Sequence, residues 1–167
     1  MKSSSASVDL IVDAGPLIAL ARLNLLQLPS RMFARALVTD VVAAECLADP
    51  AYPEFAPIQT ALDQELLERL DCNGPQPAAM WNLDKGEAST IDLALRLGTA
   101  VLVDDLAARR VARELKIPIL GTCGLLLLAK RRGHVNALRP LLEQLIESGY
   151  YLGDRLVKRV LQKAGEY

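Results

Sequence analysis

Short apolar runs alternate along this chain with segments in which apolar residues recur every three or four positions. The runs contain many β-branched and leucine residues and are bounded by polar or turn residues, which is typical of buried strands. Their lengths of four or five residues favour strands over helices. The expected strands are residues 8–12, 36–39, 66–70, 100–103 and 117–120.

The intervening segments have the spacing of helices that bury one face. They comprise residues 17–23, 41–47, 58–65, 83–97, 106–115, 123–131, 137–148 and 154–163. Strands that alternate with helices predict an α/β domain with a parallel sheet flanked by helices. Proline and glycine predict loops at 49–57 and 72–77. We expect residues 1–7 to be a loose tail and 8–167 to form a single domain.

Composition narrows the class of protein. Of the 167 residues, 51% are hydrophobic and 23% are charged, which excludes general disorder. The longest apolar run, 125–129, is too short to span a bilayer. Cys46, Cys72 and Cys123 are odd in number and far apart, so we expect reduced thiols in a cytoplasmic protein. A single histidine, His134, excludes a histidine-rich metal site.

Charge is divided unevenly along the sequence. The first 99 residues carry a net charge of −6 and the remainder carries +5. Two groups of basic residues could bind phosphates: Arg109 with Arg113, one helical turn apart, and the cluster Lys130, Arg131 and Arg132. Alternatively, these residues are solvated helix surfaces, and the cluster complements the dipole at a helix end.

Three carboxylates follow expected strands. Asp13 ends the first strand, and Asp104 and Asp105 end the strand at 100–103. In open α/β sheets the carboxyl edge is where ligands bind. A cap on the following helix also explains Asp13, whereas capping explains only one of the adjacent pair easily.

Two further carboxylates lie on helices that can lean over the same edge. Glu45 lies between the small residues Ala44 and Cys46, although glutamate is also common on helix surfaces. Glu87 is in the first turn of its helix, where the dipole alone would favour it. Asp92 is about 140° further round that helix, so only one of the two can face the site, and we choose Glu87.

Several converging carboxylates repel one another unless a cation compensates their charge. Oxygen ligands without histidine or cysteine select Mg²⁺, with Mn²⁺ as a substitute, over zinc. Such a site suits phosphodiester hydrolysis by a metal-activated water. The pattern therefore points to a metal-dependent nuclease.

The motifs resemble the PIN-domain family of VapC-type toxin ribonucleases and related nucleases. The resemblance rests on four stretches: VDAGPLIALA, LDKGEAST, LVDDLAARRVA and PILGTCGLLLLAKRRG, at 12–21, 83–90, 102–112 and 118–133. It most closely fits a subgroup with DxSPLIxLA, LDxGE and DD-xxAR motifs. It implies a three-layer α/β/α fold with a mostly parallel central sheet and extra C-terminal helices.

The resemblance also implies roles for individual residues. Asp13, Glu45, Glu87 and Asp105 match the four acids that bind the metal and catalyse, and Asp104 is a neighbour that can share the metal. The family often has a hydroxyl residue where this chain has Gly15, and a threonine where it has Val103. These departures bear on the rate and the substrate.

The function implied is that of a Mg²⁺-dependent endoribonuclease, the toxin of a toxin–antitoxin pair. Its implied partners are an RNA substrate, a small antitoxin that covers the acidic pocket, and a second copy of the chain. The main alternative is a weakly catalytic or non-catalytic module on the same fold that binds RNA or protein. A haloacid-dehalogenase phosphatase would require an acid where the chain has Gly15.

Overall fold

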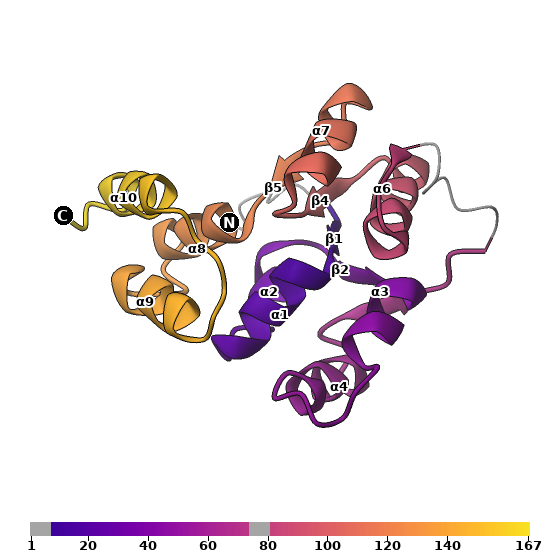
Figure 1. The fold of residues 1–167 in the computed structure, drawn as a ribbon, viewed down its shortest axis with the longest axis horizontal. Coiled ribbons are helices and arrows are strands. Elements are labelled where there is room, and N and C mark those ends of the chain that lie inside the picture. Colours follow the sequence, from indigo (N-terminus) through magenta and orange to yellow (C-terminus); the bar gives the residue numbers. More distant parts are fainter. Residues whose placement is uncertain (1–7, 74–80) are drawn as a thin grey trace, which may run out of the picture.

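The central feature of the fold is a sheet of five parallel strands (Figure 1). A computed structural model describes residues 8–73 and 81–167. The expected tail at 1–7 and most of the expected loop at 72–77 lie outside these residues. The strands are β1 Leu10–Val12, β2 Ala36–Thr39, β3 Glu68–Leu70, β4 Ala100–Leu102 and β5 Ile119–Leu120, in the order β3-β2-β1-β4-β5.

Helices cover both faces of the sheet, which confirms the predicted three-layer α/β/α class. α6 and α7 pack on one face, while α1 to α4 and α8 pack on the other. The described helices are α1 Ala14–Arg22, α2 Leu28–Met32, α3 Asp40–Cys46, α4 Phe55–Asp63, α6 Lys85–Leu97, α7 Leu106–Glu114, α8 Thr122–Arg131, α9 Arg139–Glu147 and α10 Asp154–Lys163.

The two cores follow from alternation along each strand. Leu10 and Val12 join the core beneath α1 and α8, whereas Ile11 between them joins the core beneath α6 and α7. All three are completely buried. This explains why β1 and β4 are continuous apolar runs, because both of their faces are covered by helices, whereas β3 at the edge of the sheet carries the exposed residues Glu68 and Arg69.

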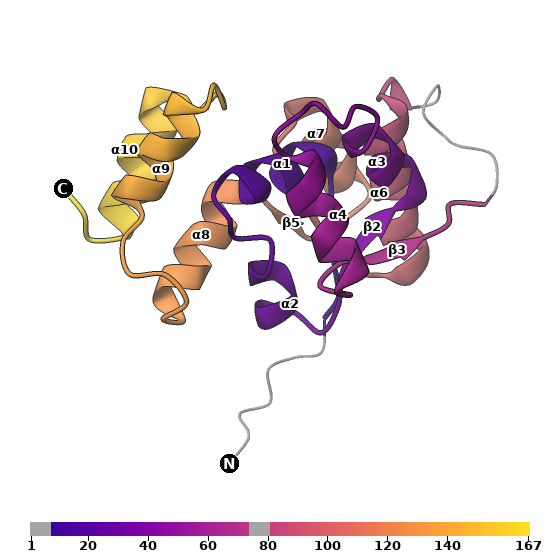
Figure 2. The ribbon, with the colours of Figure 1, turned by 90° about the horizontal axis from the view of Figure 1, so that it is seen from below.

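The C-terminal helices extend the domain beyond the sheet. α9 and α10 pack next to α8, away from the strands (Figure 2). Their apolar faces join the core beneath α1, with Leu142, Leu145, Val160 and Leu161 buried in it. No helix in the two described ranges combines the length and the apolar character needed to cross a membrane.

The chain order reverses at β1. β2 and β3 lie on one side of β1, and β4 and β5 lie on the other. Val12 pairs with Leu102, so the carboxyl ends of β1 and β4 lie next to each other. Such a switch point leaves a crevice between the helices that leave each strand, and Asp13, Asp104 and Asp105 follow these two strands.

Some local expectations were wrong. α4 begins at Phe55, within the expected loop, because Pro57 falls in its first turn, where a missing N–H costs nothing. Leu97 continues the helical spacing of Ala88, Ile91 and Ala94, which predicts a buried position, but it is 45% exposed at the end of α6. Thr122 precedes an apolar run, as a helix cap often does, but it is the first residue of α8 and its hydroxyl donates to Asp104.

A polar contact fixes the C-terminus to the helical extension. The Glu166 carboxylate accepts hydrogen bonds from Lys130 Nζ at 2.6 Å and from the backbone N–H groups of Leu138 and Arg139 at 2.7 and 2.9 Å. Desolvation opposes its ionisation, but these three donors outweigh it and lower the pKa of Glu166 to about 2. The charged form therefore stabilises the folded state above the ordinary pKa of 4.5.

We predict that Glu166→Gln lowers the free energy of unfolding by about 1–3 kcal/mol at pH 7, because it weakens hydrogen bonds to a charged acceptor. The difference from the wild type should shrink as the pH falls from 4.5 towards 2, where Glu166 itself becomes protonated. Urea unfolding at several pH values measures both effects. Glu143→Gln, on the exposed side of α9, is the matched control; an equal loss there would contradict the prediction.

Candidate active site

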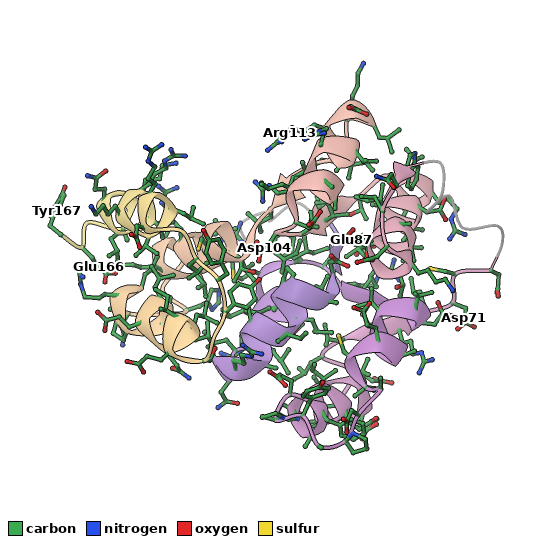
Figure 3. All side chains as sticks on the ribbon, viewed as in Figure 1. Asp71, Glu87, Asp104, Arg113, Glu166 and Tyr167 are labelled. Atoms are coloured by element: carbon green, nitrogen blue, oxygen red, sulfur yellow. The ribbon has the colours of Figure 1, made fainter. Side chains whose placement is uncertain are left out.

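A cavity of about 140 Å³ opens at the carboxyl edge of β1 and β4. Four separate segments of the chain contribute to its wall, and none of the described residues that line it is basic. Figure 3 shows Asp104 and Glu87 on opposite sides of this region, near α8 and at α6 respectively. The carboxylates that line the cavity are Asp13, Glu45, Asp84, Glu87, Asp104 and Asp105.

Asp13 is the most enclosed of these groups, with 5% of its surface exposed. It occupies the N-cap position of α1, but its side chain makes no capping hydrogen bond, so the capping explanation fails. Thr90 Oγ1 donates to Asp13 Oδ1 at 3.2 Å. Burial raises the pKa of Asp13 to about 6; the Ala14 N–H and Thr90 lower it in part, and Asp84 and Glu45 add to the rise.

Glu45 reaches the cavity from α3. Thr39 Oγ1 caps this helix by accepting from Val42 N at 3.1 Å, as the sequence suggested. A Cβ atom on Gly86 would lie 2.6 Å from Glu45 Oε2, so a side chain at position 86 would displace the carboxylate. Burial, and then the charge of Asp84, raise the pKa of Glu45.

Glu87 and Asp84 form a capping box at the start of α6. Asp84 Oδ1 accepts from Glu87 N at 2.8 Å, and Glu87 Oε2 accepts from Asp84 N at 3.4 Å. Burial raises the pKa of Glu87 to about 7, with further contributions from Asp84, Asp105 and Asp13. The predicted choice of Glu87 over Asp92 agrees with this placement, because Asp92 pairs with Arg96 at 3.0 Å and is not part of the cavity wall.

Sequence reasoning missed Asp84 as a site residue. Its only signal was its position three residues before Glu87, which indicates an N-cap. The structure shows that the cap position itself borders the cavity. The charge of Asp84 there contributes to the raised pKa values of Asp13, Glu45 and Glu87. A capping role and a site role coincide in this residue because α6 begins at the cavity.

The adjacent residues Asp104 and Asp105 have different partners. Asp105 caps α7, with Oδ1 accepting from Ala108 N at 2.9 Å. Asp104 Oδ1 accepts from Thr122 N at 2.8 Å, and its Oδ2 accepts from Thr122 Oγ1 at 2.6 Å and from the Tyr150 hydroxyl. Both oxygens of Asp104 are thus engaged by later parts of the chain.

The structure separates the two basic groups named in the sequence. Arg109 Nη1 donates to the Val103 carbonyl at 3.0 Å, so this guanidinium lies at the end of β4 beside the cavity. A Cβ atom on Gly121 would lie 2.8 Å from Arg109 Nη1 and 3.1 Å from Asp104 Oδ1, which places both side chains around this glycine. Arg113 is exposed further along α7 (Figure 3).

The cluster Lys130, Arg131 and Arg132 is not brought to the carboxylates. It lies at the end of α8, whose opposite end contacts Asp104 through Thr122, about 15 Å away along the helix. Lys130 pairs with Glu166, which Figure 3 shows far from Glu87, and Arg132 donates to the Met32 carbonyl at 3.0 Å. Two of these three cations therefore bind groups of the chain itself.

The donor set fits a hard divalent cation. Carboxylate oxygens are the ligands that Mg²⁺ and Mn²⁺ prefer, and the cavity offers no competing cation from its own wall. In the described part of the chain, no three His, Cys, Asp or Glu side chains are gathered closely enough to hold an ion as they stand. The carboxylates instead surround the cavity, and burial, with a smaller contribution from neighbouring negative charges, raises the pKa values of Asp13, Glu45 and Glu87.

The carboxylates at the switch point of this parallel α/β/α domain mark the crevice where ligands bind in open α/β sheets. A family model described as a PIN domain matches residues 9–166, and the chain belongs to that family. A comparison with curated proteins finds no match. PIN domains are generally nucleases, which supports a nuclease role for this chain.

Because the folded chain holds the Asp13 proton up to about pH 6, whereas the ordinary pKa is 3.8, the free energy of unfolding falls as the pH rises through this interval. We therefore predict that Asp13→Asn stabilises the metal-free protein at pH 8 by about 2–3 kcal/mol. Chemical denaturation in EDTA measures this gain. Asp92→Asn removes a charge from the exposed side of α6 and should give no such gain; an equally stable Asp13→Asn and wild type would contradict the argument.

Proposed function

We propose that this PIN domain is a Mg²⁺-dependent endoribonuclease that hydrolyses phosphodiester bonds. The observation that supports the proposal most is the convergence of carboxylates from four segments on a single cavity without a basic wall residue. Asp13, Glu45, Glu87 and Asp105 are the proposed metal ligands and catalytic residues, and Mn²⁺ can replace Mg²⁺. A bound cation would lower the pKa of an attacking water and stabilise charge on the phosphate.

The residues of the chain have separate tasks in this proposal. Asp13 is the buried ligand at the end of β1, Glu45 reaches the cavity from α3, and the capping box holds Glu87 at the helix start. Asp104 positions the end of β4 through Thr122 and Tyr150, so its role in metal binding is secondary to that of Asp105. Arg109 and Arg113 would contact phosphates beside the cavity.

The proposed biological role is that of a toxin whose antitoxin covers the acidic cavity. The proposed toxin role rests on the resemblance of the sequence motifs to those of VapC-type toxins. The same resemblance supports the proposals that the protein is a homodimer and that it acts on RNA in the cytoplasm. A basic or amide-rich antitoxin segment would complement six carboxylates without any metal. Such a partner would inhibit the protein by neutralising the carboxylates as well as by blocking access to the cavity.

A second candidate is a non-catalytic module that binds RNA or protein on the same fold. Gly15 favours it, because this position borders the cavity without offering a side-chain hydroxyl to bound water or phosphate. Under this alternative the carboxylates would still line the cavity, but the protein would not cleave RNA. Metal binding and cleavage must therefore be measured separately.

We predict that the wild type cleaves at least one member of a panel of single-stranded and structured RNAs in Mg²⁺ or Mn²⁺ but not in EDTA. Asp13→Asn and Glu87→Gln should each lower the rate by at least about 100-fold, since even residues that only support metal ligands typically cost 10- to 100-fold. Gel analysis of labelled RNA gives the rates.

Asp92→Asn is the matched control for Glu87→Gln, because it removes a carboxylate from the same helix but away from the cavity. It should cleave at the wild-type rate. Undiminished cleavage by Asp13→Asn in a contaminant-free preparation would refute the assignment. Absence of both cleavage and metal binding would favour the non-catalytic module.

We predict that Mn²⁺ affinity increases with pH between about 5.5 and 8, because the raised pKa values of Asp13 and Glu87, about 6 and 7, keep these ligands protonated in acid. Calorimetry in buffers of different ionisation enthalpy should show more protons released at pH 6 than at pH 8. Glu87→Gln should release fewer protons at pH 6 than the wild type. A pH-independent affinity would contradict this prediction.

A further inference from the structure

The segment that follows α9 begins at the acidic cavity. The Tyr150 hydroxyl donates to Asp104 Oδ2, and a Cβ atom on Gly15 would lie 3.6 Å from the same hydroxyl. This contact ties the start of the segment to the end of β4. The residues just after Tyr150 thus continue from a side chain that reaches the cavity wall, and α10 itself packs on the C-terminal extension.

The next residue, Tyr151, has the opposite environment. Tyr150 packs against the core, whereas 90% of the surface of Tyr151 is exposed. Leu106, which directly follows Asp105 on the other side of the site, is 78% exposed. An exposed aromatic ring next to a residue bonded to Asp104 is available to stack on an unpaired base.

The solvent face of α10 carries a stripe of positive charge. Val157, Val160 and Leu161 face the core, and Arg155, Arg159 and Lys163 recur every fourth residue on the opposite side. The stripe is about 12 Å long, from the helical rise. Figure 3 shows side chains with nitrogen atoms along α10, and Asp104 lies between α10 and α7 in this view.

The charges of this stripe are not neutralised by the chain. Arg155, Arg159 and Lys163 are all exposed, and none of them forms an ion pair with any described residue. Asp154 is the only acidic residue in the sequence of α10. The basic cluster at the end of α8 differs in this respect, because Lys130 and Arg132 have intramolecular partners.

A nuclease with this cavity needs a separate surface to attract its substrate, because six carboxylates repel a phosphate backbone. An aromatic platform combined with a basic track is the combination that binds single-stranded nucleic acid. We infer that residues 151–163 bind the single-stranded RNA that leads into the cavity. Tyr151 stacks on a base, and Arg155, Arg159 and Lys163 contact successive phosphates.

The part of this inference that has the RNA lead into the cavity rests on the proposed nuclease function. Binding of RNA to residues 151–163 can be measured without cleavage. The probe is a fluorescein-labelled single-stranded RNA of mixed sequence, titrated with the full chain in EDTA and followed by fluorescence anisotropy. Arg155→Gln with Arg159→Gln should weaken binding at least about 10-fold. It should also make the slope of log affinity against log salt shallower by about 1.4, or 0.7 for each lost phosphate contact.

Tyr151→Ala should weaken binding by about 5- to 100-fold with the salt slope unchanged, whereas Tyr151→Phe keeps the ring and should bind within about twofold of the wild type. The charge-matched control is Arg31→Gln with Arg69→Gln, two exposed arginines on α2 and β3. It should bind like the wild type. Equal losses in this control, or wild-type affinity in the Tyr151 and Arg155 variants, would overturn the inference.

Cleavage in Mg²⁺ separates the two proposals. Affinity lost in the variants, with no cleavage by the wild type of any RNA, would support the binding surface and refute the nuclease assignment. Wild-type cleavage that retains its kcat/KM in the variants would support the nuclease and overturn the surface. Loss of binding to polyglutamate alone, with RNA binding unchanged, would assign the stripe to an acidic protein and also overturn the inference.

Discussion

Mutual repulsion among carboxylates at the edge of the sheet is the constraint on which the rest of this structure depends. Asp13, Glu45, Asp84, Glu87, Asp104 and Asp105 share a cavity of about 140 Å³. The fold holds them there through buried strands and helix caps at a cost in free energy, because burial first, and the neighbouring negative charges second, raise the pKa values of Asp13, Glu45 and Glu87. A divalent cation is the simplest group that removes the cost, which connects the stability of the metal-free chain to its proposed activity.

The scaffold limits the repulsion by giving individual carboxylates different surroundings. Asp105 and Asp84 accept hydrogen bonds from the first turns of α7 and α6. Asp104 is bonded to Thr122 and Tyr150 and so joins the C-terminal extension to the sheet. Positive charge lies outside this wall, along α7 and α10, where it can attract a polyanion without neutralising the site.

Local pattern was sufficient for most of the secondary structure and for the parallel α/β class. It failed where a competing interaction decided the outcome. Thr122 has the sequence features of a cap, but Asp104 accepts its hydroxyl proton. The sequence also could not show that Lys130 pairs with Glu166, which is far along the chain. Asp84 was not singled out from the sequence, and only the position of α6 relative to α3 shows that this helix cap also borders the cavity.

The sequence by itself determined that carboxylates follow β1 and β4, because strand ends can be located from short apolar runs and turn residues. It also determined that Glu87 and Asp92 cannot both face the site, since helical rotation separates them, and the structure places Glu87 in the cavity wall. Only the tertiary structure decided which carboxylate oxygens are engaged, that Gly86 makes room for Glu45, and that Tyr150 reaches Asp104. These contacts join residues that are 41 to 46 positions apart, and the distance between such residues depends on how helices pack across the sheet.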